Sequence, residues 1–280
     1  MDATVSPAPF LVLAHHRSGS NFLNDLVQAH PRVDCINEPF SMHTPFFRHC
    51  DLEPWTAADF DPRWLHRSLA PHEPLREFLC ELRQHLLHSS ARRLVGFKET
   101  GLFGKLEWLK AFVPSLRVVI VKRDPRAVVS SVLRSGLMSL WRYGELVPRA
   151  FHALWPGYAS QAGAAERDAE LAAMSVAVRY RLAEQCAGLS ETHAFWLEDF
   201  MREPVPHLRR LCDFLGIDVH PLQSSFLAER QCVSRGGRYS SFRTRVDVNV
   251  GWRRSLEPRQ VAAVDAVMAF AGVATTHSSH

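Results

Sequence analysis

Five short apolar runs recur along the chain, and polar or charged residues follow each of them. The runs span residues 10–14, 33–36, 94–97, 116–121 and 193–197. Short runs of this kind are typical of the buried strands of a parallel sheet. Apolar residues at helical spacing recur in the chain between them. The pattern predicts an α/β fold, with a mainly parallel sheet flanked by helices on both faces.

Three later segments have the pattern of helices that cover such a sheet. Residues 75–86 carry one apolar face, residues 166–189 form a long alanine-rich stretch with one apolar stripe, and residues 256–270 are amphipathic. Another helix is expected to close at Gly216. No internal repeat or low-complexity linker is present, which favours a single domain over residues 1–280.

The turn after the first run concentrates groups that bind anions. It consists of Arg17, Ser18, Gly19, Ser20 and Asn21. Glycine permits a tight backbone, and the amides that open a helix have no partner within it. These amides suit a phosphate or a sulfate, because the positive end of the helix dipole, the Arg17 cation and the polar side chains of the turn lie beside them. An ordinary strand-to-helix turn with a capping serine explains the same residues, so this segment alone leaves both readings open.

A second polar turn follows the run at residues 116–121. Asp124 suits the N-cap of a helix and Pro125 suits its first position, so we predict a helix from there. Arg123 lies at the end of the strand, and Ser131 lies two turns into the helix. Together these two side chains could grip a second anion.

Composition and charge narrow the range of functions. The 280 residues are 46% hydrophobic and carry a formal charge of +4, with basic residues scattered. That favours local anion sites over a nucleic-acid surface. No stretch approaches the ~20 apolar residues of a membrane span, and the N-terminus lacks the pattern of a signal peptide. We therefore expect a cytoplasmic protein without stable membrane insertion; the oligomeric state stays open.

Cysteine and histidine patterns do not predict a metal site. The six cysteines are far apart and form no CxxC pair, so we expect free thiols in a reducing compartment. Fifteen histidines include the pair His15 and His16, but no HExxH motif or Cys/His cluster accompanies them. The GxxxxGK motif of nucleoside triphosphatases, followed by serine or threonine, is also absent.

Four segments, in order along the chain, resemble the sulfotransferase superfamily that uses 3'-phosphoadenosine 5'-phosphosulfate (PAPS). RSGSNFL at 17–23 is similar to that family's loop for the 5'-phosphosulfate, and Arg123 and Ser131 match the spacing of its 3'-phosphate motif. Residues 195–217 look like its strand, acidic turn and helix, and GWRRSL at 251–256 resembles the segment that folds over the cofactor. The resemblance implies a P-loop-like nucleotide-binding fold with PAPS as donor, desulfonated PAP as product, and no metal.

The resemblance also assigns cofactor contacts. Besides Arg123 and Ser131, the implied contacts are Arg17, Ser18, Gly19, Ser20, Asn21, Phe22, Arg245, Trp252 and Arg253. Arg245 lies seven residues before Trp252, as does the first basic residue of the family's RKGxxGDW, although the intervening VDVNV lacks the expected Lys-Gly. Relatives often have an adenine-contacting tyrosine where Leu197 stands.

Glu38 is the predicted general base. It falls at the carboxyl end of the second run, the side of an open α/β sheet where ligands bind. An acceptor hydroxyl has a pKa far above 7, so its attack on sulfur needs a group that takes the proton. Carbohydrate, glycolipid and protein-tyrosine sulfotransferases have a glutamate similarly placed, often before proline, as in Glu38-Pro39. The structural alternative is a solvated turn carboxylate or a partner for a nearby arginine.

Lys98 follows the third run and is expected at the same edge of the sheet as Arg17 and Glu38. A lysine there could neutralise the charge that builds on the bridging oxygen as the sulfonate leaves. Many relatives in the carbohydrate branch carry a similar lysine. The alternative is an ion pair of Lys98 with Glu99 or with Glu38.

The acceptor is expected to bind residues of segments 41–93 and 134–165, which are rich in aromatic side chains, although core packing explains those residues equally well. A glycan or glycolipid hydroxyl is the first expectation, and a peptide tyrosine or a phenolic small molecule is the second. Two rival functions stay open. A nucleotide-dependent kinase would need a magnesium carboxylate and a Gly-Lys pair, and a non-catalytic protein would keep only the anion-binding loop.

Overall fold

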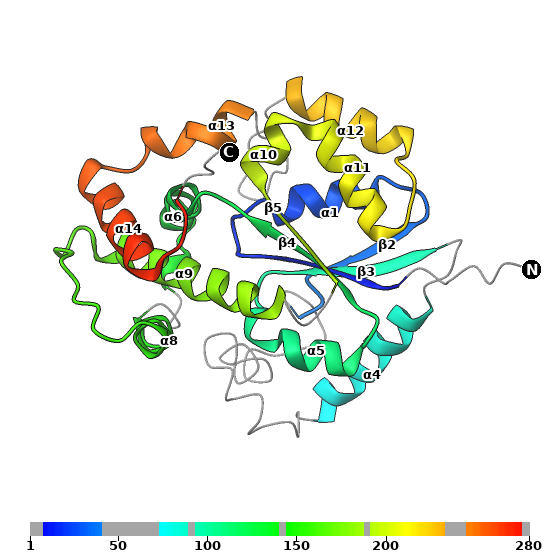
Figure 1. Ribbon diagram of the computed structural model, residues 1–280, viewed down its shortest axis with the longest axis horizontal. Coiled ribbons are helices and arrows are strands. Elements are labelled where there is room, and N and C mark those ends of the chain that lie inside the picture. Colours follow the sequence, from blue (N-terminus) through cyan, green and yellow to red (C-terminus); the bar gives the residue numbers. More distant parts are fainter. Residues whose placement is uncertain are drawn as a thin grey trace, which may run out of the picture.

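The computed structural model describes residues 8–40, 73–88, 93–139, 144–187, 191–232 and 245–275. A five-stranded sheet forms its centre (Figure 1). Its strands are β1 (Phe10–Ala14), β2 (Val33–Asn37), β3 (Leu94–Glu99), β4 (Arg117–Lys122) and β5 (Thr192–Trp196). All pairings are parallel, in the order β2-β3-β1-β4-β5. The predicted strands and the parallel sheet are confirmed.

Each strand sends alternate side chains to opposite faces of the sheet. Leu11 and Leu13 of β1 belong to one apolar core cluster, whereas Phe10 and Val12 belong to another. All of these side chains are fully buried. A strand covered on both faces reads as a continuous apolar run, which is why the sequence pattern was visible.

Helices cover both faces. The first core cluster is formed with α4 (Glu73–Leu87), α5 (Leu106–Phe112), α6 (Pro125–Arg134), α8 (Leu146–Leu154), α9 (Arg167–Ala187) and α14 (Pro258–Ala271). The second is formed with α1 (Ser20–Gln28), α10 (Leu197–Arg202), α11 (Pro204–Leu215), α12 (Pro221–Cys232) and α13 (Arg245–Val250). Short 3-10 turns are η1 (Phe103–Lys105), η2 (Leu137–Ser139) and η3 (Gly251–Arg254).

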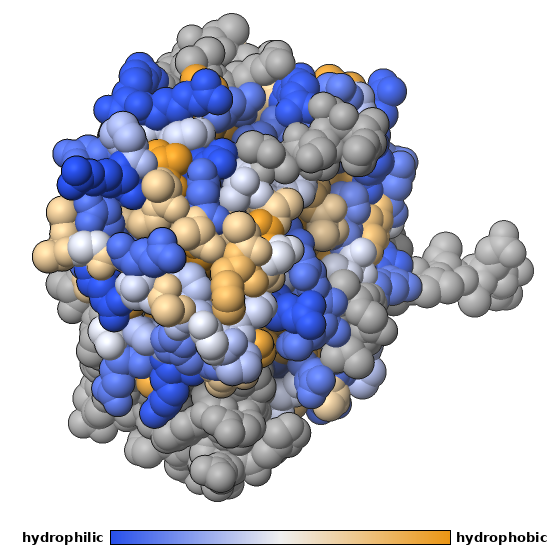
Figure 2. Space-filling model, turned by 60° about the vertical axis from the view of Figure 1, so that its left-hand side comes forward, coloured by the Kyte–Doolittle hydropathy of each residue, from blue (hydrophilic) through white to orange (hydrophobic). Residues whose placement is uncertain are grey.

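The left-hand side of Figure 1, where α8, α9, α13 and α14 lie, comes forward in Figure 2. Hydrophobic side chains gather near the centre of that face, and hydrophilic side chains surround them. Helix α14 packs against α9 and α6, with its residues Val264, Val267 and Met268 fully buried. The C-terminal helix is therefore part of the core, as its apolar pattern predicts.

The segment after β5 differs from the expected acidic turn. Residues 197–202 form the short helix α10, whose first turn contains Glu198 and Asp199. Carboxylates stabilise the positive end of a helix, so these acidic residues favour a helix start rather than an open turn. Pro204 then begins α11, and Gly216, with φ of 74°, ends it as predicted.

The segments predicted to bind the acceptor are only partly described. Residues 41–72, 89–92 and 140–143 lie outside the described residues. The described helices of these segments, α4 and α8, contribute Leu82, Leu86 and Phe151 to the core. An acceptor role for these segments stays a prediction.

No helix within the described ranges is long and apolar enough to span a bilayer. Over the same ranges, no group of three or more histidine, cysteine, aspartate or glutamate side chains gathers as metal ligands do. Cys35, Cys80 and Cys212 are free thiols.

Candidate active site

The candidate residues converge at the carboxyl edge of the sheet. Because the strands are parallel, the segments that follow them emerge at one edge. Strand β1 has β3 on one side and β4 on the other, so the strand order changes direction there. Ligands of open α/β sheets bind beside such a switch point. The turn after β1 therefore lies where a ligand site is expected.

Gly19 shapes this turn. It is the N-cap of α1 with a left-handed φ of 89°, and within the described structure no side chain caps this helix. The capping serine considered from the sequence is thus not found. A Cβ at Gly19 would lie 2.6 Å from Leu197 Cδ2, so both the backbone and the packing require glycine. The opening amides of α1 point out of the helix, as an anion site needs.

Arg17 joins the two predicted anion sites. It has a left-handed φ of 70°, and its Nε donates to Ser131 Oγ at 2.9 Å. Its carbonyl oxygen accepts a hydrogen bond of 2.8 Å from Arg123 Nη1. The residues predicted to hold the two ends of a nucleotide are therefore hydrogen-bonded to one another, with two guanidinium groups among them.

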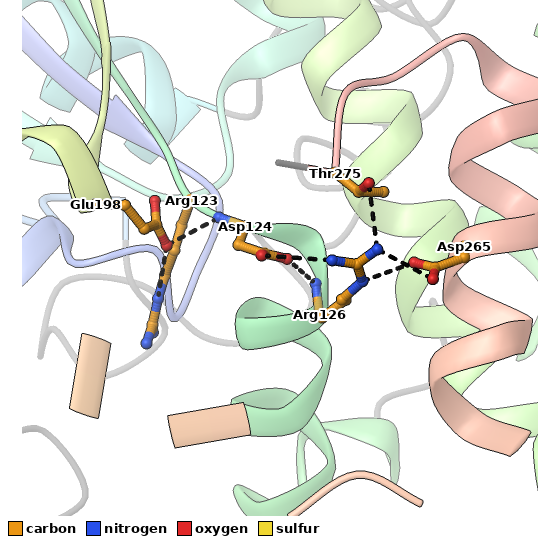
Figure 3. Close-up of polar contacts among 6 residues, drawn as sticks. All are labelled: Arg123, Asp124, Arg126, Glu198, Asp265 and Thr275. Atoms are coloured by element: carbon orange, nitrogen blue, oxygen red, sulfur yellow. Dashed lines mark hydrogen bonds and ion pairs between the residues drawn. The ribbon is translucent and has the colours of Figure 1, made fainter. Parts of the chain in front are cut away.

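Arg123 is held from several directions. The Tyr180 hydroxyl accepts from the Arg123 N–H and donates to the Arg123 carbonyl, both at 2.7 Å. Glu198 Oε1 lies 3.9 Å from Arg123 Nε and accepts a hydrogen bond of 3.1 Å from the Asp124 N–H (Figure 3). Burial lowers the pKa of Arg123 and raises that of Glu198 to about 7, while their mutual attraction opposes both shifts.

Helix α6 begins as predicted. Asp124 is its N-cap and accepts a hydrogen bond of 2.8 Å from the Arg126 N–H, and Pro125 occupies the first turn. Burial raises the pKa of Asp124 to about 6. The helix then places Ser131, which is almost fully buried, toward Arg17.

Glu38, Lys98 and Asn21 form a second polar group beside the turn. The ammonium of Lys98, which is fully buried, donates to Asn21 Oδ1 at 2.9 Å and forms an ion pair with Glu38. The Glu38 side chain is 32% exposed, and its φ of 48° is left-handed. The Lys98–Glu38 ion pair, which the sequence analysis gave as an alternative to a catalytic role, is present in the structure. Lys98 thus connects the ends of β2 and β3 to the start of α1.

Glu99 points to the opposite face of β3, so the alternative Lys98–Glu99 ion pair is not formed among the described residues. Its carboxylate accepts hydrogen bonds from the Phe40 N–H at 2.7 Å and from the Thr100 N–H at 3.2 Å. Burial raises the pKa of Glu99 to about 8. Glu99 therefore fixes the backbone just after Glu38, a role that the sequence analysis missed.

The other predicted cofactor contacts in the turn after β1 and the start of α1 are buried. Ser18 and Ser20 are buried, and Phe22 packs against Phe200 and Phe226 in the core. The ring of Phe22 is therefore part of the core. A nucleotide contact for these residues stays a prediction.

The C-terminal contacts are reached through α6. Two guanidinium groups lie over the Trp252 ring, with Arg126 at 5.2 Å and Arg253 at 5.3 Å from its centre. Arg245 is the first residue of α13, and its side chain lies outside the described residues. The structure brings Trp252 to the α6 side of the site, and Arg253 is exposed.

Helix α9, predicted from its apolar stripe alone, also contributes polar residues beside the turn after β1. Ser175 Oγ lies 3.1 Å from His15 Nε2 and accepts a hydrogen bond of 3.0 Å from Arg179. Arg179 also lies 3.4 Å from His16 Nδ1. Ser175 and Arg179 are one helical turn apart, and this spacing is the only local sequence signal that the two side chains lie together. Their partners are about 160 residues away in sequence.

Comparisons with known proteins show the family and the fold of the chain. A sequence model described as the Sulfotransferase family matches residues 9–221. No curated protein sequence matches the chain. Among solved structures, the sulfotransferase domain of the Synechococcus PCC 7002 olefin synthase is 16% identical, with a TM-score of 0.56 and 97% of each chain covered.

Two further structures have the same fold. The sulfotransferase domain from the curacin biosynthetic pathway is 14% identical, with a TM-score of 0.55 over 96% of this chain and 99% of that one. Mouse sulfotransferase SULT7A1 complexed with PAP is 12% identical, with a TM-score of 0.50 over 95% of this chain and 85% of that one.

Proposed function

The chain belongs to the sulfotransferase family, and we propose that it transfers a sulfonate group from PAPS to a hydroxyl group of an acceptor, with Glu38 as general base. The observation that carries this proposal is the direct contact among the residues predicted to bind anions. Arg17 is bonded to Ser131 and Arg123, and the Glu38–Lys98 pair reaches the same turn through Asn21.

The donor follows from the charges that such a site can bind. PAPS carries a phosphosulfate at its 5' end and a phosphate at its 3' position. The opening amides of α1 and Arg17 suit the 5' end, and Arg123 with Ser131 suits the 3'-phosphate. The mouse sulfotransferase of the same fold is complexed with PAP, which supports PAPS as the donor. A 3'-phosphate site is what separates PAPS from ATP.

The proposed reaction is an in-line displacement at sulfur. The acceptor oxygen forms a bond to sulfur while the bond from sulfur to the 5'-phosphate oxygen breaks, and PAP leaves with that electron pair. Glu38 takes the proton of the acceptor hydroxyl. Arg17, Lys98 and the helix amides meet the charge on the leaving phosphate, so no step is assigned to a metal.

The Glu38–Lys98 pair suits these two roles. Lys98 holds the Glu38 side chain beside the turn through their ion pair, where Glu38 could take a proton from an acceptor hydroxyl. As Glu38 takes the proton, Lys98 loses its counter-charge and can donate to the oxygen between sulfur and phosphorus. Asn21 holds the ammonium at 2.9 Å, which keeps it beside the turn.

For the acceptor we propose a glycan or glycolipid hydroxyl, because relatives with a glutamate in the position of Glu38 include carbohydrate and glycolipid sulfotransferases. A peptide tyrosine or a phenolic small molecule is the second choice. Both present a hydroxyl whose proton must be removed.

Transfer of radioactive sulfonate from labelled PAPS to a panel of glycan, glycolipid, tyrosine-peptide and phenol acceptors tests the proposal. We expect Glu38→Gln to lower kcat/KM by roughly 10²- to 10⁴-fold. Its PAP affinity by calorimetry should stay within about threefold, since the base does not hold the nucleotide. Glu107→Gln, an exposed acidic residue of α5, is the matched control. Transfer at an unchanged rate in Glu38→Gln would remove Glu38 from the mechanism.

A further inference from the structure

Helix α6 makes polar contacts with two different parts of the chain. Ser131 faces the turn after β1, where it accepts the hydrogen bond from Arg17. Arg126 and Ser130 are one helical turn apart, and they face the C-terminal part of the chain instead. The Ser130 and Ser255 hydroxyl oxygens lie 2.7 Å apart. The helix that carries the predicted 3'-phosphate residue is therefore also bound to the segment that ends the fold.

Arg126 makes the strongest of these connections. Its Nε and Nη2 donate to the two carboxylate oxygens of Asp265 in α14, at 2.7 and 3.0 Å (Figure 3). Nη2 also lies 3.4 Å from Thr275 Oγ1, and Nη1 lies 4.0 Å from Asp124 Oδ2. Paired N–H donors on a carboxylate give directional as well as electrostatic strength. Hydrogen bonding to Asp265 raises the pKa of Arg126 accordingly.

The same guanidinium lies over Trp252, 5.2 Å from its ring centre. Trp252 belongs to η3, which leads through Ser255 into α14. A cation over an indole face is attracted to it. Arg126 thus contacts the indole directly and also holds the helix that follows it in the chain. Two carboxylates already surround Arg126, so its charge is largely neutralised before any nucleotide binds.

We propose that Arg126 is a positioning residue: its ion pair with Asp265 latches Trp252 and α14 to the first turn of α6, and so sets how long the nucleotide product is retained. This inference rests on the proposed function, because it assumes that PAP occupies the Arg17, Arg123 and Ser131 site. Loss of the latch frees the C-terminal segment to move away, so PAP leaves faster while its rate of association changes little.

Stopped-flow measurement of PAP dissociation tests the latch, with the full-length chain and the variants Arg126→Gln, Asp265→Asn and the double variant. Each single variant should release PAP about 5- to 20-fold faster, which lies within the range of typical coupling between sites. The double variant should be no faster than either single one, because both changes remove the same interaction. The KM for PAPS should rise, and kcat at saturating substrates should not fall.

Arg117→Gln is the matched control. It removes an ion pair with Glu191 of the same 2.7 Å length, at the start of β4 and thus at the opposite edge of the sheet. Its PAP dissociation rate should equal that of the unmodified chain. Additive effects in the double variant, or faster release in Arg126→Gln but not in Asp265→Asn, would overturn the latch.

Hydrogen exchange of the ligand-free proteins separates this inference from the proposed function. Amides of residues 251–271 should exchange faster in Arg126→Gln and in Asp265→Asn than in Arg117→Gln. Unchanged exchange would overturn the latch even if PAP binds. Faster exchange in a chain that binds no PAP would support the connection between Arg126 and residues 251–271. It would overturn a role of that connection in nucleotide retention, and it would reject the proposed function.

Discussion

At the scale of single residues, Tyr180 decides where Arg123 lies. Its hydroxyl satisfies both the N–H and the carbonyl of Arg123. Leaving a buried polar group without a partner costs about 1–3 kcal/mol. We expect Tyr180→Phe to lower the free energy of unfolding in urea by about 2 kcal/mol. Calorimetry should also find weaker PAP binding, because Arg123 loses its anchor.

Tyr158→Phe is the control for this prediction. It removes a hydroxyl that donates to Glu170 at 3.0 Å, a contact between α9 and the loop before it. It should lower stability but leave the PAP affinity unchanged. Equal PAP affinities for Tyr180→Phe and Tyr158→Phe would show that Tyr180 has no specific role at the site.

Glu99 should make stability depend on pH. Burial raises its pKa from an ordinary 4.5 to about 8 in the folded protein. Between those two values the folded chain keeps a proton that the unfolded chain releases, so the free energy of unfolding falls as pH rises. The decline from this group is on the order of 1 kcal/mol per pH unit and stops above its folded pKa.

Urea denaturation between pH 5 and 9 measures this decline. Glu99→Gln cannot titrate and should flatten the profile, whereas the exposed control Glu107→Gln should keep the slope of the unmodified chain. Parallel profiles for Glu99→Gln and the unmodified chain would mean that Glu99 is already ionised in the folded state.

Some site residues could be predicted from sequence and others could not. Arg123 and Ser131 are tied by a spacing of eight residues across one helix start, which is local information. Lys98 and Glu99 are neighbours in sequence, and only the pairing of β3 reveals which one faces α1. Tyr180 could not be found, because nothing in α9 signals a partner 57 residues away.

At the scale of elements, the junction of β1, α1 and α10 depends on Gly19. We expect Gly19→Ala to lower the free energy of unfolding by about 1–3 kcal/mol, because alanine resists a φ of 89°. Its Cβ would also meet Leu197. Leu197→Ala removes the contact but not the backbone strain, so thermal denaturation should show that Gly19→Ala costs less stability in a Leu197→Ala background than in the unmodified chain, but still costs some. A Gly19→Ala chain as stable as the original would contradict this account.

Element boundaries followed local signals where those signals exist. Asp124 and Pro125 predicted the start of α6, and Gly216 predicted the end of α11. Helix α10 was missed because its six residues are too short to display helical periodicity. The acidic residues in its first helical turn were the available signal of a helix start, but they were interpreted as part of an open turn.

At the scale of the whole molecule, the parallel sheet could be predicted but its strand order could not. Continuous apolar runs indicate strands buried on both faces. The order β2-β3-β1-β4-β5 depends on pairings of β1 with β3 and β4, which are distant in sequence. That order creates the switch point beside β1, and hence the place where the predicted anion residues meet.

The central claim is that this edge of the sheet binds a nucleotide with a 3'-phosphate. Calorimetric titration of PAP, AMP and ATP into the unmodified chain and Arg123→Ala tests it most directly. We predict that PAP binds at least about tenfold more tightly than AMP or ATP, as expected for charge-assisted hydrogen bonds to the 3'-phosphate, and that Arg123→Ala removes most of this preference. Equal or tighter binding of ATP would contradict the sulfotransferase mechanism and favour a nucleotide-dependent kinase.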